Sequence, residues 1–228
     1  MSNTSLGRAE KGSKYWMQTV ILYDGLRARL NAMIGEPGME WLSPLAGEYG
    51  TFAEYSLGQK NAVSARIGVS DVPGFFDGFW PRRQPQWDGI GIGGDGRILY
   101  LVEAKAHVSE MISRLSASDP DSRRLIEHSL RATFETYPGA KDFTVWTDRY
   151  YQLANRLAFL RFLNGRSAEL KIGEVRLVLL NFVNDHTYLP EAQSIWDAYY
   201  AQVWEQMTGV GHAPAGVTEV FFDVGDIH

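Results

Sequence analysis

The sequence predicts a mixed α/β fold in which helices cover both faces of a central sheet. Two unbroken apolar runs, in 96–105 (GRILYLVEAK) and 174–183 (EVRLVLLNFV), are typical of central strands that are covered on both sides. Other segments repeat apolar residues at helical spacing. With 228 residues, of which 45% are hydrophobic, the chain can bury a sizeable core, and we expect one domain over 1–228 with a flexible polar leader at 1–13.

Two helices are expected in the N-terminal part of the chain. Residues 15–35 place apolar side chains at helical spacing before a stop at Gly35, namely Val20, Leu22, Leu26, Leu30 and Met33. A short second helix is predicted over 43–58, because Ser43 can cap it and Pro44 can occupy its first position, although Gly47 and Gly50 weaken it.

The middle and the end of the chain supply the sheet and its later helices. Residues 68–86 are dense in glycine, proline and aromatic residues, which favours a loop, and a strand is expected near Trp87. The stretch GGDG, 93–96, predicts a hairpin turn into the strand of 96–105. Helices are predicted between Asp119 and Pro138, over 148–165 and over 190–207, followed by a short strand at 218–224.

Gly91, Gly93 and Gly96 also match the G-x-G-x-x-G pattern of dinucleotide-binding folds. That site needs a helix after its glycines, because the helix N-terminus holds the pyrophosphate. Here a strand follows, so a hairpin is favoured, and a small-molecule α/β enzyme that uses this turn is disfavoured.

Charged residues gather where the predicted hairpin ends. Glu103 and Lys105 are two residues apart on a strand, so their side chains emerge on one face. A turn centred on residues 95 and 96 pairs position 88 with about 103, which brings Asp88 beside Glu103. Two carboxylates can hold Mg²⁺ or Mn²⁺, which neutralises phosphate charge and acidifies a water that a lysine can orient. A solvated ion pair is the ordinary alternative at this spacing.

Asp88 followed by Glu103-Ala104-Lys105 on a second hairpin strand resembles the PD-(D/E)xK nuclease superfamily, and the order of predicted elements is similar to its restriction-endonuclease-like αβββαβ core. The stretches FWPRRQPQWDGIG, LVEAKAH and YQLANRLAFLRFL resemble an uncharacterised bacterial branch without a known substrate. Trp87 departs from the pattern, because a proline commonly precedes the aspartate. The resemblance implies that Asp88 and Glu103 bind Mg²⁺ or Mn²⁺ and that Lys105 positions the attacking water.

The resemblance also implies further site residues. Members often add an acid from the first core helix, for which Glu54 is the first choice and Glu48 the second, with an exposed helical carboxylate as the alternative. A polar residue on a later helix often reaches the metal-bound water, and Gln152 fits this role, with Tyr151 and Asn155 as its helical neighbours. An ordinary glutamine on a helix surface is the alternative.

Other residues near the motif are candidates for substrate contacts. His107 could touch a phosphate or act as a general base, or it could be a hydrogen-bonded histidine at a strand end. Several arginines predict either a local phosphate-binding rim or solvated helix charges, namely Arg82, Arg83, Arg114, Arg123, Arg124 and Arg131. An aromatic group could stack on unpaired bases or, as is more common, seal a core under a loop; it comprises Phe75, Phe76, Phe79 and Trp80.

Composition limits the remaining choices. The absence of cysteine excludes disulfides, thiolate zinc sites and cysteine nucleophiles, and the net charge of −5 means that any contact with nucleic acid must be local. The sequence lacks a signal-peptide core and a membrane-spanning run, so we expect a cytoplasmic protein without membrane contact. Aromatic residues in 195–207 could form a homodimer face or pack on the protein's own sheet.

Two functional hypotheses follow from the sequence. The first is a metal-dependent nuclease that hydrolyses phosphodiester bonds of DNA or RNA. The alternative is a catalytically silent nuclease-fold protein that binds nucleic acid or a protein partner. Metal binding by Asp88 and Glu103 distinguishes the two.

Overall fold

The fold is built on a five-stranded mixed sheet. The computed structural model describes residues 8–46 and 52–227. The strands are β1 (Glu40–Ser43), β2 (Gly89–Ile92), β3 (Ile98–Lys105), β4 (Glu174–Val183) and β5 (Val217–Asp223), and they lie in this order across the sheet. β1, β2 and β3 pair antiparallel, whereas β3, β4 and β5 pair parallel. The predicted α/β class is confirmed.

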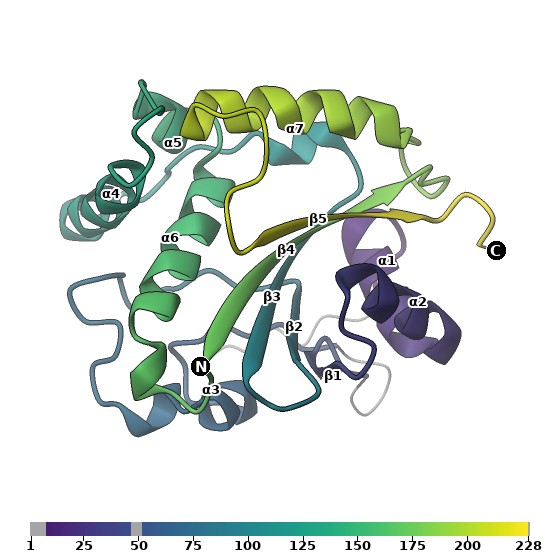
Figure 1. The fold of residues 1–228 in the computed structure, drawn as a ribbon, viewed down its shortest axis with the longest axis horizontal. Helices are drawn as coiled ribbons and strands as arrows, with labels where there is room; N and C mark the ends of the chain where they lie inside the picture. The colour runs from purple at the N-terminus through teal and green to yellow at the C-terminus, as the bar shows by residue number, and fades with distance from the viewer. Residues whose placement is uncertain (1–7, 47–51, 228) are drawn as a thin grey trace.

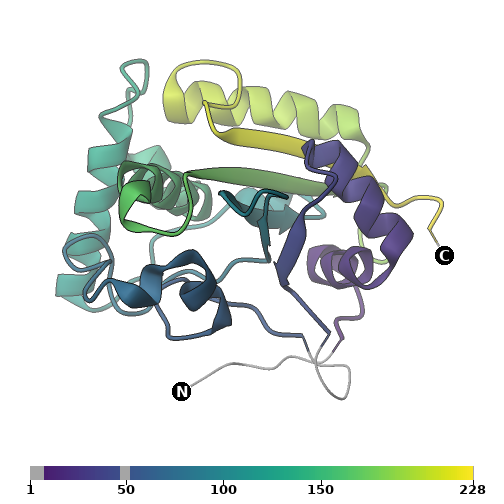
Figure 2. The same ribbon diagram turned by 60° about the horizontal axis from the view of Figure 1, so that its bottom comes forward.

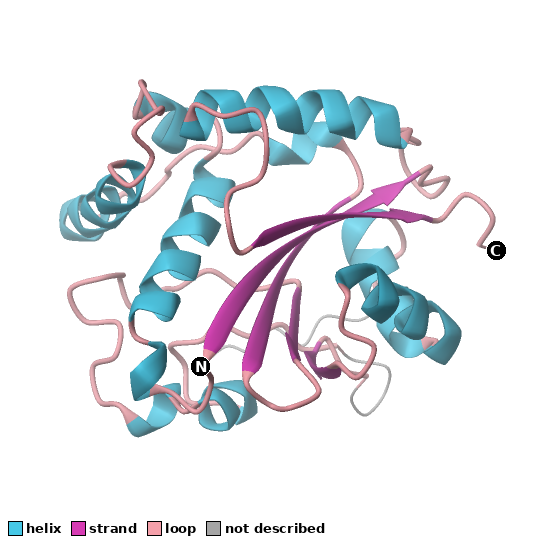
Figure 3. Cartoon of the chain, viewed as in Figure 1, coloured by secondary structure: helices cyan, strands magenta, loops and turns pink. Residues whose placement is uncertain are grey.

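Helices cover both faces of the sheet, as Figures 1 and 3 show. On one face lie α1 (Gly12–Leu22) and α2 (Asp24–Ile34), drawn in purple in Figure 1. On the other lie α6 (Tyr151–Gly165) and α7 (Gln193–Thr208), accompanied by α3 (Ala62–Ile67), α4 (Pro120–Phe134) and α5 (Thr144–Asp148). The view in Figure 2 shows the same separation into layers. No helix of the described ranges is long and apolar enough to cross a membrane.

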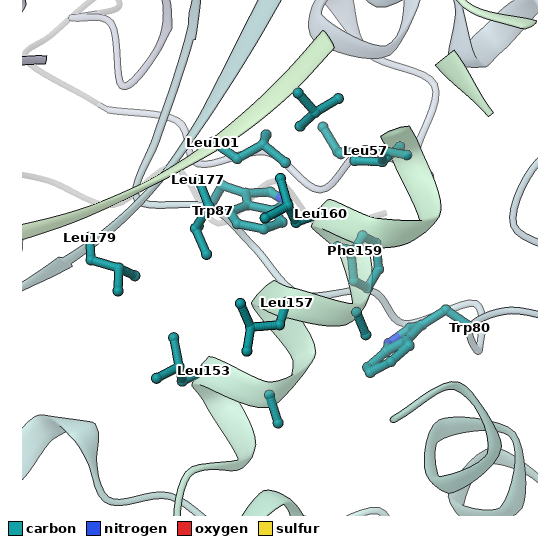
Figure 4. Close-up of a cluster of buried hydrophobic side chains, with 14 of the residues drawn as sticks. Leu57, Trp80, Trp87, Leu101, Leu153, Leu157, Phe159, Leu160, Leu177 and Leu179 are labelled. Carbon is teal, nitrogen blue, oxygen red and sulfur yellow. The ribbon is translucent and has the colours of Figure 1, made fainter. Parts of the chain in front are cut away.

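Side chains of β3 alternate between the two layers. Tyr100 and Val102 pack with the α1 and α2 layer, whereas Leu99 and Leu101 pack with the α6 and α7 layer. Figure 4 shows leucines of α6 beside those of the sheet, with Leu153, Leu157 and Leu160 on the helix and Leu101, Leu177 and Leu179 on the strands. The predicted apolar stripe of this helix is confirmed. Glu103 and Lys105 follow Leu101 at the same alternation and therefore extend into the α6 layer.

The predicted hairpin joins β2 to β3. The Gly93 N–H donates to the carbonyl of Ile98 at 2.7 Å, and the Gly96 N–H donates to that of Gly93 at 2.7 Å. Gly96 has a φ of 76°, which favours glycine. The structure pairs Gly89 with Val102, so position 88 stands opposite 103, as the register argument predicts.

Two predicted helices at the N-terminal side are wrong in form. Residues 15–35 form α1 and α2 instead of one helix, because Tyr23 is extended and the chain bends so that both helices pack on one sheet face. Gly35 ends α2 in the left-handed conformation, as predicted. The predicted helix over 43–58 is absent from its described residues: β1 ends at Ser43, whose hydroxyl donates to the Ala53 carbonyl at 2.9 Å rather than capping a helix.

Most later elements match their predictions. α4, α6, α7, β4 and β5 lie within a few residues of the expected bounds, and Asp119 caps α4. The short helices α3 and α5 had not been predicted. The aromatic group of the 68–86 loop is buried, with the Phe79 ring stacked at 3.8 Å from that of Phe162, so the expectation that it seals the core is confirmed. Trp196, Tyr200 and Trp204 of α7 are likewise buried against the protein's own sheet.

One close backbone contact fixes the end of α7 and yields a test. A β-carbon at Gly209, where φ is 79°, would lie 2.2 Å from the carbonyl carbon and oxygen of Gly139. We expect Gly209→Ala to lower the free energy of unfolding by about 2 kcal/mol or more, because strain and a backbone clash add. Gly165→Ala is the matched control, since nothing lies within 4 Å of its added carbon. Equal urea denaturation midpoints for the two variants would contradict this account.

Candidate active site

The structure brings the three residues of the predicted motif into one buried cluster. Glu103 and Lys105 are 4% and 7% exposed, and the Lys105 ammonium donates to Oε1 of Glu103. Asp88 lies directly before β2, half-buried, and its Oδ2 accepts the Ala104 N–H at 2.8 Å. The carboxylates therefore share one end of the hairpin, and a solvated surface ion pair is not what the chain forms there.

Arg156 of α6 is a fourth member of the cluster. It is 3% exposed, and its Nε and Nη2 both lie 2.6 Å from Oε2 of Glu103. Nη2 also donates to the Gln86 carbonyl at 2.8 Å, and the guanidinium lies 4.3 Å from the ring centre of Trp87. This one side chain thus joins α6, β3 and the segment that leads to Asp88.

Sequence reasoning missed Arg156, although a signal was present. Arg156 stands three residues after Leu153 and four before Leu160, so it lies on the apolar stripe that faces the sheet. A charged residue on a buried stripe needs a charged partner from another element. The glutamate of the motif was the available anion.

The two cations determine the ionisation of Glu103. Burial opposes the charged form, but Arg156 and Lys105 together outweigh it and lower the pKa of Glu103. In the same way, burial acts against the charge of Lys105, while Glu103 and Asp88 outweigh it and raise the pKa of that lysine. Glu103 is therefore an anion held between two permanent cations.

Asp88 differs because its charge is poorly compensated. Burial, and next the negative charge of Glu103, raise the pKa of Asp88 to about 7, against the opposing effect of Lys105. Its Oδ2 accepts one backbone bond, and its Oδ1 accepts none from the described residues. A cation at this oxygen would offset the buried negative charge.

The two carboxylates fit a hard divalent cation that needs only one or two ligands from the protein. Mg²⁺ is commonly held by one or two carboxylates and completes its shell with water and substrate phosphate, and Asp88 and Glu103 can supply that pair. Within 8–46 and 52–227 there is no group of three or more His, Cys, Asp or Glu side chains that could hold a metal. Any metal here would depend on water and substrate for its other ligands.

A cavity of about 10 Å³ lies beside the cluster and has room for about one water. Its polar lining comes from Glu103, Lys105, Gln152 and Tyr200. Gln152, predicted to approach the site from a helix, therefore lies beside Lys105. Tyr200 had not been predicted; its hydroxyl donates to Oδ1 of Asn181 at 2.9 Å.

The predicted fourth acid is placed differently. Glu54 belongs to an extended segment next to the Tyr55–Trp87 bridge and not to a helix, so its expected position on a core helix is wrong. Its carboxylate pairs with Lys14 of α1 at 2.7 Å. Glu48 falls outside the described residues.

His107 belongs to a neighbouring network. Its Nε2 lies 2.9 Å from Oε1 of Glu191, and its Nδ1 accepts the Ser109 N–H at 3.1 Å. The second oxygen of Glu191 accepts the Val108 N–H at 2.8 Å. This arrangement is the hydrogen-bonded strand-end histidine that was the alternative to a catalytic role.

The predicted arginine rim divides into engaged and exposed members. Four of its arginines make local contacts: Arg114 with the Asp148 carbonyl, Arg123 with Glu127, Arg124 with Asp121 and Arg131 with the ring of Phe143. Arg82 and Arg83 are exposed and line two different clefts.

Comparisons of the chain with protein-family models, with curated proteins and with solved structures find no match.

The role of Arg156 predicts a large effect on stability. Replacing it by methionine leaves Glu103 with one cation and the Gln86 carbonyl without its donor, so we expect the free energy of unfolding to fall by about 3 kcal/mol or more. Arg156→Lys keeps the charge but loses the paired donors, and its loss should be smaller. Arg161→Met changes an exposed arginine of the same helix and should stay within about 0.5 kcal/mol of wild type in urea denaturation. Similar losses for Arg161→Met and Arg156→Met would contradict the assignment.

The raised pKa of Asp88 predicts a pH-dependent effect on folding. Between its ordinary value of 3.8 and about 7, the folded protein keeps a proton that the unfolded chain releases, so this residue lowers stability as the pH rises through that window. Asp88→Asn cannot ionise and still offers an acceptor to Ala104. The stability of the variant relative to wild type should therefore increase from about pH 4 to about pH 8. Chemical denaturation of both proteins across this range measures the effect. A difference in free energy of unfolding that stays constant with pH would refute the prediction.

Proposed function

We propose that this protein is a metal-dependent nuclease of the PD-(D/E)xK type that hydrolyses phosphodiester bonds in DNA or RNA. The observation that carries the proposal is the hairpin register, which sets Asp88 opposite Glu103 with Lys105 on the same buried face. The order of elements supports it, since α1, the strands β1 to β3, α6 and β4 follow the αβββαβ sequence of that superfamily. The remaining helices and β5 would be additions to this core.

In this proposal Asp88 and Glu103 hold Mg²⁺ or Mn²⁺. When bound, the cation supplies charge neutralisation at the phosphate and an acidified water. Lys105, fixed by Glu103 at the wall of the small cavity, donates a hydrogen bond from its ammonium to a water there and so orients that water. Arg156 keeps Glu103 ionised and in place, so it acts as a positioning residue. Exclusion of bulk water strengthens each of these interactions.

The distribution of charge along the chain supports a local approach of a polyanion. Residues 167–228 contain 2 basic and 9 acidic residues, a net −7, whereas residues 1–166 contain 20 basic and 18 acidic residues, a net +2, and the two sum to −5. The motif and α4 to α6 all lie within residues 1–166. The negative charge that would repel nucleic acid is thus concentrated in β4, α7 and β5 and their connections.

One observation favours a second candidate function. Both oxygens of Glu103 already accept bonds from buried cations, so the charge of Glu103 is compensated without a metal. A catalytically silent nuclease-fold protein that binds nucleic acid or a protein partner could keep such a cluster for its structural value. Metal binding at Asp88 separates the two proposals.

The nuclease proposal is tested by cleavage of labelled single-stranded, duplex and branched DNA and RNA in Mn²⁺ and Mg²⁺. We expect Lys105→Ala to lower the cleavage rate about 100-fold or more, because a positioned donor is lost from a buried site. Lys141→Ala removes an exposed lysine and should cleave like wild type.

Thermal stabilisation by Mn²⁺ provides the second measurement. It should persist in Lys105→Ala, whose proposed ligands are intact, and disappear in Asp88→Asn. If wild type shows no cleavage and no stabilisation by Mn²⁺, the nuclease is excluded and the silent binding protein is favoured.

A further inference from the structure

A second cleft lies beside Asn155, the residue that directly precedes Arg156. It measures about 450 Å³, within the range of sites for small organic groups. The 80–85 loop, the 116–119 segment, the start of α4 and the first turns of α6 contribute its lining. The proposed nuclease chemistry does not use it.

The side-chain amide of Asn155 is a polar group of this cleft that has a hydrogen-bond donor without a described partner. It is 5% exposed, and its Oδ1 accepts Nη1 of Arg156 at 3.2 Å. Its Nδ2 donates to none of the described groups. Because Asn155 lines the cleft and this nitrogen has no partner among the described groups, it is available to an acceptor atom of a ligand.

The walls favour a flat, uncharged ligand. Trp80, Pro85 and Tyr151 supply rings along the lining, and Ser116 and Ser118 supply small hydroxyls. Arg83 and Asp119 contribute one positive and one negative charge. Such a site is well suited to a heterocycle that combines a ring face with hydrogen-bonding edges.

Two residues that line the cleft are sequence neighbours of residues that contact the cluster of Asp88, Glu103, Lys105 and Arg156. Asn155 directly precedes Arg156, and Pro85 directly precedes Gln86, whose carbonyl accepts from Arg156 at 2.8 Å. The same guanidinium contacts Glu103 at 2.6 Å. Residues next in the chain to Asn155 and Pro85 thus contact the proposed catalytic Glu103 or its arginine partner, and a nucleotide whose phosphate lies at the carboxylates could extend its base into the cleft.

We propose that this cleft binds one nucleobase of the substrate. Nδ2 of Asn155 donates to an acceptor on the base edge, as asparagine amides do in nucleic-acid recognition. The half-buried Tyr151 ring contacts a face of the base, in the manner of single-strand binding sites. Arg83 contacts the adjoining phosphate. The polymeric substrate rests on the proposed nuclease function, whereas binding of the base itself does not.

The test measures binding of the common nucleosides and their 5′-monophosphates by saturation-transfer NMR without divalent metal. We expect at least one nucleoside to bind wild type with a Kd of about 1 mM, the weak affinity of a single small group. Asn155→Asp retains the acceptor for Arg156 and removes the donor, and it should weaken that nucleoside at least about fivefold, the loss of roughly one hydrogen bond. Arg83→Ala should weaken the monophosphate and leave the nucleoside unchanged.

Controls separate this cleft from other sites. Lys60→Ala removes an exposed cation from a different cleft, the one that Arg82 lines, and should bind like wild type. If Asn155→Asp is destabilised in thermal unfolding, Tyr151→Ala replaces it as the variant that removes a wall. Absence of binding of every nucleoside to wild type, or unchanged binding in the folded cleft variant, overturns the proposal.

Failure of the nuclease proposal is recognisable separately. Nucleoside binding that persists in Lys105→Ala, together with no cleavage by wild type, would leave the cleft established and the nuclease rejected. Cleavage without nucleoside binding would give the opposite result.

Discussion

The ionic contact between Glu103 and its two buried cations is the constraint on which this part of the structure depends. A carboxylate that is removed from water needs compensating charge, and here the cations come from different elements: Lys105 from the same strand and Arg156 from α6. The contact therefore joins α6 to β3. Because Arg156 also binds the Gln86 carbonyl, it fixes the chain that delivers Asp88 to the sheet. The site and the packing of the helix layer share one network.

The same network assigns distinct properties to two neighbouring carboxylates. Both oxygens of Glu103 accept bonds from cations, which lower its pKa and keep it ionised. The pKa of Asp88 is raised instead, to about 7, so its protonated and ionised forms are similarly populated near neutral pH. Residues of one chemical type thus acquire different roles from their surroundings. Only Asp88 retains an oxygen without a described partner, so the response of the cluster to an added cation depends mainly on that side chain.

The sequence allowed the sheet centre and the motif geometry to be predicted, because both follow from local rules. An unbroken apolar run identified β3 and β4, and turn chemistry at Gly96 fixed the register that sets Asp88 opposite Glu103. Features that depend on tertiary contacts were missed or wrong. β1 forms because it pairs with β2, a contact that the local sequence does not show. Glu54, further along the chain, lies in an extended segment although its local sequence favours a helix. Arg156 became interpretable only once α6 lay on the sheet.

The parallel pairing of β3 with β4 has a consequence for the order of folding. The hairpin closes over a short stretch and can form within microseconds, whereas α6 lies inside the long crossover that connects β3 to β4. Glu103 and Arg156 are 53 positions apart along the chain, so their contact belongs to the slower, nonlocal stage of folding. Until that stage is complete, Glu103 must remain hydrated, because its burial requires the arginine. The cluster of Asp88, Glu103, Lys105 and Arg156 is thus complete only when the whole α/β layer has closed around it.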